Sequence, residues 1–222
     1  ALDATFPATG SIWYVIQGSG TAAIAGETIE WAACDVFILP GGDTVALTAG
    51  DADAVLWSVT NEPHIAFEST RPVEVDDSTV DIVHFPAAEI DRQIGMLYEV
   101  EQSDAAGIAL VFSSEKQFAR RNITPTMTLA MNTLPPGDTQ PAHRHNSVAV
   151  TLVVQGEGCY STVDGRRKPW APWVTTITPP VSVHSHTNGG DKLAKFLIVQ
   201  DGGLYYHART MGFSFDLFTP EA

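Results

Sequence analysis

The chain has 222 residues, of which 44% are hydrophobic, and a formal net charge of −14 at pH 7. This length is sufficient for one large or two small domains with buried cores. The negative charge disfavours nucleic-acid binding, which needs a basic surface, and disfavours anionic membranes. No uninterrupted apolar run reaches membrane-spanning length. We therefore expect neither a nucleic acid nor a membrane as a partner.

The cysteine content points to a reducing compartment. The chain contains two cysteines, Cys34 and Cys159, and they form no Cys-x-x-Cys pair. Nothing in this pattern indicates the disulfide framework that is typical of small secreted domains. We therefore expect a cytoplasmic protein.

Two segments of the chain repeat one another. Val-Ile-Gln-Gly-Ser-Gly at residues 15–20 is matched by Val-Val-Gln-Gly-Glu-Gly at residues 153–158, and Trp31 is matched by Trp170 further along. Each copy reads as short strands rich in Val, Ile, Thr and aromatic residues, separated by Gly, Pro, Asp and Asn. The repeat predicts an all-β fold made of two copies of one unit.

A segment of different character separates the two copies. Pro86 precedes apolar residues at helical spacing, which predicts an amphipathic helix that begins at the proline. A strand-like run follows from Ile108 to Phe112. We predict a first domain at residues 1–70, a connector with a helix at residues 71–126, and a second domain with a C-terminal tail at residues 127–222.

Four of the seven histidines fall in two short stretches of the second copy. His143 and His145 alternate with Arg144, so both imidazoles point to one face of a strand. His184 and His186 repeat this spacing, and we expect them on a facing strand. Neutral imidazole is a common ligand of divalent transition metals, and three converging imidazoles make a competent site. The sequence therefore predicts a metal centre in the second copy.

The same stretches follow the spacing of two known motifs. The first contains Gly137, His143, His145 and Gly156, and the second contains Pro179, His184 and Asn188. Through these residues the second copy resembles the cupin superfamily. The resemblance implies a jelly-roll barrel, also called a double-stranded β-helix. Together with the repeat it implies a bicupin with a short helical connector, whose metal ligands are His143, His145 and His184.

Longer matches narrow the resemblance. They comprise Pro141-Ala142-His143-Arg144-His145, Val163-Asp164-Gly165, Thr178-Pro179, and the group His184, His186 and Asn188. These residues are similar to those of the gentisate 1,2-dioxygenase group, which includes 1-hydroxy-2-naphthoate and salicylate dioxygenases. The resemblance implies an oxidoreductase that uses mononuclear non-heme Fe(II) and O2 to cleave the ring of a hydroxylated aromatic acid, with His186 as a catalytic residue beside the substrate.

Three residues are candidates for substrate binding. Thr151 stands where the family has an arginine that holds the substrate carboxylate, and threonine cannot supply that bidentate contact. Asn188 belongs to the second motif. Trp173 is a candidate for lining the pocket, and packing in the core or at the rim is its alternative reading. The substrate therefore stays open among gentisate, salicylate and 1-hydroxy-2-naphthoate.

The ligand set leaves other functions open. Three neutral ligands leave the charge of the metal uncompensated and several positions vacant, which favours an anionic ligand and O2. Imidazole also suits Mn, Ni and Zn, so a lyase, isomerase or hydrolase that uses another metal is a second hypothesis. A non-catalytic cupin that binds a small ligand is a third.

The first copy differs from the second at all three ligand positions. Thr5, Pro7 and Val45 stand where the second copy has its candidate ligands, so we predict a degenerate, metal-free cupin. The first copy also lacks a counterpart of residues 127–140. The missing strands could come from the tail at residues 204–215, from the connector or from a neighbouring subunit. Alternatively, they could lie in N-terminal residues that precede this sequence in a longer chain. We expect a homo-oligomer.

Overall fold

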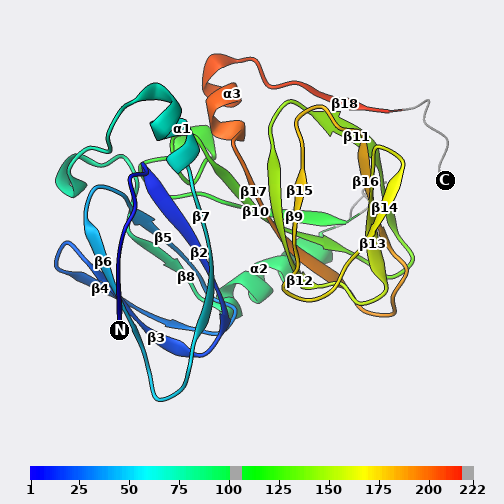
Figure 1. The fold of residues 1–222 in the computed structure, drawn as a ribbon. Coiled ribbons are helices and arrows are strands. Elements are labelled where there is room, and N and C mark those ends of the chain that lie inside the picture. Colours follow the sequence, from blue (N-terminus) through cyan, green and yellow to red (C-terminus); the bar gives the residue numbers. More distant parts are fainter. Residues whose placement is uncertain (101–106, 217–222) are drawn as a thin grey trace. The chain divides into compact units, whose positions relative to one another are not determined.

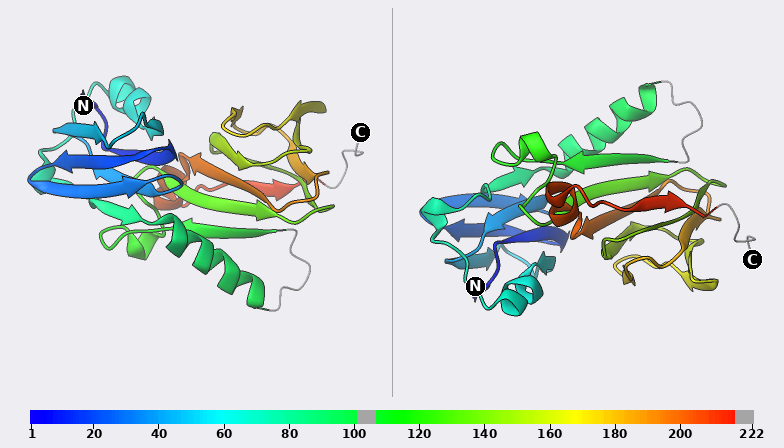
Figure 2. Two further views of the ribbon diagram at one scale, coloured as in Figure 1. Left: turned by 90° about the horizontal axis from the view of Figure 1, so that it is seen from below. Right: turned by 90° about the horizontal axis from the view of Figure 1, so that it is seen from above.

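The computed structural model describes residues 1–100 and 107–216. The chain forms two compact units, Ala1–Gln93 with Ser113–Pro125 and Ile94–Phe112 with Thr126–Ala222. Figure 1 labels the elements, and Figure 2 shows the strands of the first unit in blue to blue-green and those of the second in green to red. Among the described helices, none is long and apolar enough to cross a membrane.

The first unit contains two four-stranded antiparallel sheets. In order across the sheet, the first consists of β1 (Leu2–Thr5), β6 (Thr44–Ala49), β3 (Ser19–Ile24) and β4 (Glu27–Ala32). The second consists of β7 (Val55–Thr60), β2 (Gly10–Gln17), β5 (Val36–Pro40) and β8 (Val83–Phe85). The helical segments are α1 (Glu62–Glu68), the short 3₁₀ turns η1 (Val75–Asp77) and η2 (Phe118–Arg120), and the beginning of α2 (Ala87–Glu99).

Aromatic side chains fill the space between these two sheets. The ring of Trp13 stacks on that of Phe37 with centroids 5.7 Å apart, and Trp31 stacks on Phe37 from the other sheet at 6.5 Å. Val45 belongs to the same buried cluster. Alternate residues of each strand contribute to this core, because successive side chains of a strand point to opposite faces. Apolar side chains therefore fill the described core between the two sheets of the first unit.

The second unit contains two five-stranded antiparallel sheets. In order across the sheet, the first consists of β15 (Thr175–Thr178), β12 (Ala149–Gln155), β17 (Ala194–Gln200), β10 (Thr128–Leu134) and β9 (Ile108–Phe112). The second consists of β14 (Arg166–Pro169), β13 (Cys159–Val163), β16 (His184–Asn188), β11 (Thr139–His145) and β18 (Phe213–Phe215). Helix α3 (Gly202–Ala208) follows β17.

The strand orders confirm the repeat. The order β1-β6-β3-β4 of the first unit returns as β11-β16-β13-β14 in the second, and β7-β2-β5 returns as β17-β12-β15. The predicted all-β jelly roll is therefore confirmed in both copies, as are the helix after Pro86 and the strand at Ile108–Phe112. The predicted domain boundaries stay a prediction.

Three strands of the second unit, β10, β9 and β18, have no described counterpart in the first. In the second unit β10 pairs with β17, but β7, the equivalent of β17, is the outermost described strand of its sheet. The tail strand β18 pairs with β11, and the connector strand β8 pairs with β5 at the opposite edge from β7. Neither therefore supplies the strand that the repeat would place beside β7.

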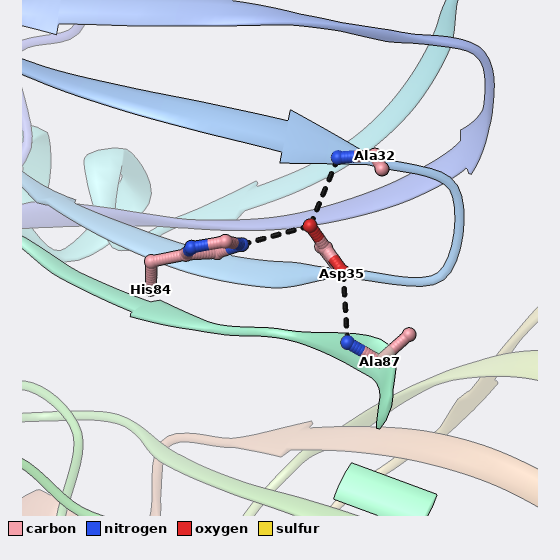
Figure 3. Close-up of polar contacts among 4 residues, drawn as sticks. All are labelled: Ala32, Asp35, His84 and Ala87. Atoms are coloured by element: carbon pink, nitrogen blue, oxygen red, sulfur yellow. Dashed lines mark hydrogen bonds and ion pairs between the residues drawn. The ribbon is translucent and has the colours of Figure 1, made fainter. Parts of the chain in front are cut away.

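A buried aspartate joins three segments of the first unit (Figure 3). The carboxylate of Asp35 accepts hydrogen bonds from the backbone N–H of Ala32 at 2.9 Å, from the His84 ring at 2.8 Å and from the N–H of Ala87 at 2.8 Å. Ala87 is the first residue of α2, so the carboxylate lies at a helix N-terminus, where an anion is favoured. Asp35 thus fixes the start of the connector helix to the turn before β5.

Candidate metal centre

The four clustered histidines lie on two neighbouring strands. His143 and His145 are on β11, His184 and His186 are on β16, and antiparallel pairing places His143 directly opposite His184. The expectation that the second pair lies on a facing strand is therefore wrong. The long segment between the pairs forms β12 to β15 and then returns the chain to the same sheet, as a jelly roll requires.

Three of these side chains converge. The ligand nitrogens of His143, His145 and His184 all lie within 4.8 Å of one another, and all three residues are buried. The ring centroids of His143 and His184 are 4.2 Å apart, as expected for directly opposite residues on paired strands. The structure thus brings together the three residues that were predicted to be metal ligands.

Each of these rings is held by a backbone carbonyl. Nδ1 contacts a carbonyl oxygen two residues away: Pro141 for His143 at 2.8 Å, Ser147 for His145 at 2.8 Å and Ser182 for His184 at 2.9 Å. A carbonyl only accepts hydrogen bonds, so Nδ1 carries the proton in the neutral ring. The unprotonated Nε2 atoms are left to bind a metal, and the carbonyls fix their direction.

Burial keeps two of the rings neutral. The pKa of His184 is lowered to about 4, mainly by desolvation and also by the nearby His143 and His145, against the opposing effect of the Ser182 carbonyl. Desolvation also lowers the pKa of His143. Because only a neutral imidazole binds a metal, the site is prepared for a cation at neutral pH.

His186 lies beside the triad in a different hydrogen-bond arrangement. Its Nδ1 is 2.8 Å from the Ser161 hydroxyl oxygen, which accepts a hydrogen bond from the Trp170 indole N–H at 2.8 Å. A hydroxyl that accepts from the indole has its own proton available for His186 Nδ1. When Ser161 donates this proton to His186 Nδ1, the proton of the neutral His186 ring is on Nε2. Burial, followed by the effect of the neighbouring histidines, lowers its pKa to about 3, so the ring is neutral.

The four histidines open into a cavity of about 300 Å³. Thr151, which is buried, also lines it. The described residues around the cavity include no Asp or Glu, so no carboxylate compensates the charge of a bound cation. A divalent metal held by three neutral imidazoles would therefore favour an anionic further ligand.

The cavity has walls that the sequence analysis did not identify. Gln140 and Gln200 line it, as do Tyr206 and Phe213 from the C-terminal segment. The ring of Phe213 lies 5.3 Å from that of His143 because β18 pairs with β11. The alternating Phe-Ser-Phe of the tail is a strand signal, but only its pairing partner shows that this strand borders the site.

Two predicted substrate-binding residues lie elsewhere. Among the described residues that line the cavity, neither Asn188 nor Trp173 occurs. The Asn188 amide, which is fully buried, donates to the carbonyl oxygens of Leu134 and Lys192 at 2.8 Å, so it fastens the end of β16 to neighbouring segments. Trp173 is 40% exposed in the turn before β15. Their role in substrate binding stays a prediction.

The arrangement fits a transition metal on chemical grounds. Three unprotonated imidazole nitrogens meet in a buried space, and the Gln200 amide donates a hydrogen bond to His145 Nε2 at 3.2 Å, which agrees with an unprotonated nitrogen. Three protein ligands leave positions open, as in catalytic rather than closed structural sites. The set does not select among iron, manganese, nickel and zinc.

The family comparison agrees with this geometry. Residues 130–200, which include all four histidines and the strands that carry them, match the cupin domain family. The second unit contains a cupin domain. The two units together have the bicupin fold that was predicted, because the first repeats the strand order of the second.

Curated relatives of the chain are dioxygenases of aromatic acids. A gentisate 1,2-dioxygenase of Ralstonia sp is 39% identical over 79 residues, which are 36% of this chain and 22% of that protein. Gentisate 1,2 dioxygenase 1 of Aquipseudomonas alcaligenes is 30% identical over 140 residues, which are 63% of this chain and 38% of that protein. The matched segments thus span less than half of either relative.

Solved structures extend the likeness in fold to nearly the whole chain. Salicylate 1,2-dioxygenase from Pseudaminobacter salicylatoxidans matches with a TM-score of 0.77 and 12% identity, over 95% of this chain and 73% of that one. The adduct of this dioxygenase with gentisate matches with a TM-score of 0.73 and 11% identity, over 97% and 70%. At this identity the likeness establishes the shared fold.

Proposed function

We propose that the chain carries the active site of an Fe(II)-dependent dioxygenase that cleaves the ring of a hydroxylated aromatic acid. The observation that carries this proposal is the convergence of His143, His145 and His184, each with Nδ1 bound to a carbonyl, in a cavity without a described carboxylate. The relatives named gentisate 1,2-dioxygenase support the choice of reaction.

The metal and the protein have separate tasks in this proposal. Bound Fe(II) would supply the chemistry that joins an electron-rich aromatic substrate to O2. The three histidines hold the ion through Nε2 atoms that the Nδ1–carbonyl contacts align, and the lowered pKa values of His143 and His184 keep these two rings neutral for the metal. Phe213 and Ile198, which line the cavity, limit the access of bulk water to the reacting groups.

His186 is proposed to bind and orient the substrate. Ser161 occupies its Nδ1, which leaves the Nε2–H to donate a hydrogen bond to an oxygen atom of the substrate. The neutral ring adds no positive charge next to the metal ligands. A positioned donor of this kind stabilises negative charge that develops on oxygen during the reaction.

Thr151 directs the substrate choice. Its side chain is buried against the cavity and offers a hydroxyl but no positive charge. Gentisate and salicylate both carry a hydroxyl group next to a carboxylate, and such a pair can chelate a metal through adjacent oxygens. We therefore propose that the carboxylate is held at the metal and not by a cation at position 151.

The test is anaerobic loading of the full chain with Fe(II), followed by O2 uptake with gentisate, salicylate and 1-hydroxy-2-naphthoate. Consumption of one O2 per substrate, with loss of the aromatic absorbance, is the expected result. The same assay after loading with Mn, Ni or Zn tests whether another metal supports the reaction. Activity that needs no O2 would support a lyase, isomerase or hydrolase, and metal-independent ligand binding without turnover would support a binding protein.

A further inference from the structure

A second and larger cavity lies in the same unit as the histidine site. It has a volume of about 670 Å³ and is lined by residues of β13, β14, β15 and the turns beside them. β14 and β15 are the outermost described strands at one edge of the two sheets (Figure 1). The cavity is therefore a groove between the edge strands β14 and β15, which belong to different sheets, and we call it the seam groove.

One wall of the seam groove is cationic. The pairing of β13 with β14 places Arg166 opposite Val163 and Lys168 opposite Ser161, and all four residues line the groove. Directly opposite residues of an antiparallel pair share a face, so Arg166 and Lys168 point to the side of the sheet that carries Ser161. Both cations thus face the groove.

The residue between them faces the other way. Arg167 pairs with Thr162, and its guanidinium lies 3.7 Å from the centre of the Tyr160 ring, outside the groove. Charged side chains protect the edge of a sheet from unwanted pairing, and Arg167 can serve that purpose. Protection of the edge does not by itself require two cations that line a cavity.

A single described acid accompanies the two cations in the lining. This is Asp164, whose carboxylate accepts a hydrogen bond from the Val183 N–H at 3.0 Å. This hydrogen bond joins the turn after β13 to the residue before β16, the strand that carries His184. Positive charge therefore exceeds negative charge along the described lining.

The opposite wall is partly apolar. Val174 and Pro179 line the groove together with Thr176 and Thr178, and Val174 keeps 40% of its surface exposed. The pairing of β15 with β12 places Thr176 opposite Thr151, on the inner face, and Ile177 opposite Val150, on the outer face. An apolar side chain that stays exposed on a cavity wall gains from covering by an apolar ligand. A planar ring can lie against this wall while a charged substituent meets Arg166 and Lys168 on the other side.

The seam groove adjoins the histidine cavity. Thr178 lines both cavities, and Ser161, which lines the groove, is hydrogen-bonded to His186 in the histidine cavity. Thr178 and Ser161 thus separate a ligand in the groove from the histidine cavity. The histidine cavity, at about 300 Å³, is the smaller of the two.

We propose that the seam groove is a binding site for aromatic carboxylates, with the carboxylate at Arg166 and Lys168 and the ring against Val174 and Pro179. The identification of the ligand rests on the proposed function, whereas binding in the groove requires no metal. The whole chain has a net charge of −14, which repels anions at long range. A local pair of cations beside the site raises the concentration of the anionic substrate where the reaction needs it.

The test compares a charged ligand with a neutral one of the same shape. Salicylate and salicylamide are titrated into the full chain, without added metal and at low ionic strength, and binding is followed by NMR. In the double variant Arg166→Gln/Lys168→Gln we expect the affinity for salicylate to fall about fivefold, the range of two exposed charge contacts, with salicylamide unchanged. Added salt should weaken salicylate binding to the unsubstituted chain.

Arg167→Gln is the matched control, since it removes the same charge from the opposite face of the same strand. It should leave salicylate binding unchanged. Equal losses in the control and the double variant, or no loss in either, would overturn the proposal, as would a failure of salicylate to bind without metal. His143→Ala separates the two proposals: it should remove metal-dependent turnover but not salicylate binding in the groove. Absence of dioxygenase activity together with intact charge-dependent binding would refute only the proposed function.

Discussion

The two units share one strand order but differ in what occupies the space between their sheets. In the first, Trp13, Phe37 and Trp31 stack on one another and fill it with apolar rings. In the second, His143 and His184 face each other across paired strands and leave a cavity. A strand framework of this kind is thus compatible with either a packed interior or a polar site, because the inward-facing residues decide between them.

The difference also shows how the second unit remains stable with a cavity. Leu134, Val153, Trp170 and Phe196 form a buried cluster next to the histidines. The Trp170 ring contacts both this cluster and His186, with centroids 5.5 Å apart. The apolar cluster therefore supports the polar residues from one side. Among the described residues of the first unit, no group of His, Cys, Asp and Glu converges in the manner of the triad.

The largest expected effect tests the asymmetry of metal binding. His143→Ala should lower metal content to background and reduce dioxygenase turnover by about 10³-fold or more, because the metal contributes several kcal/mol to the reaction. Thr5→Ala, at the residue that the sequence repeat aligns with His143 and that the structure leaves exposed, should change neither. Metal analysis and O2 uptake measure both variants. Full metal occupancy in His143→Ala would contradict the ligand assignment.

A histidine introduced into the apolar core of the first unit should destabilise the protein without creating a metal site. Val45 is 1% exposed within the apolar cluster, so Val45→His would bury an imidazole without a polar partner. We expect a loss of about 3 kcal/mol in the free energy of unfolding. Val45→Ile, which only adds a methylene group, should cost about 1.5 kcal/mol or less. Denaturant unfolding distinguishes them, and a stable Val45→His variant would show that the first barrel is less tightly packed than described.

Metal binding should stabilise one unit selectively. A ligand that binds only the native state at 100 times its dissociation constant stabilises that state by about 2.7 kcal/mol. Hydrogen exchange should therefore slow in β11 and β16 when a divalent metal is added and return to its earlier rate with a chelator. The equivalent strands β1 and β6 serve as an internal reference, and equal protection of both pairs would argue against a site confined to the second unit.

The smallest expected effect concerns the hydroxyl that holds His186. Ser161→Ala removes the hydrogen bond to His186 Nδ1 and the acceptor for the Trp170 indole. We expect turnover to fall about tenfold with metal content unchanged, as is typical when a partner of a site histidine is lost. Ser161→Thr keeps the hydroxyl and should restore most of the activity. A loss of metal in Ser161→Ala would assign Ser161 to metal binding instead.

The sequence by itself determined the repeated β architecture, the connector helix and the identity of the three converging histidines. The architecture and the helix depend on local patterns, namely alternation on a strand, proline at a helix start, and matching turns in the two copies. The choice of His143, His145 and His184 among the four clustered histidines came from the resemblance to the cupin motifs. Thr5, Pro7 and Val45 likewise showed from sequence alone that the first copy lacks the ligand set.

Only the tertiary structure decided which strands are neighbours. It placed His184 beside His143 on the same sheet, brought Phe213 of the tail to the wall of the cavity, and turned Asn188 toward the backbone of other segments. It also showed that Arg166 and Lys168 face a groove while Arg167 does not. Strand pairing is a contact between residues distant in the chain, so its register and partners are set by the packing of the whole unit and not by local sequence.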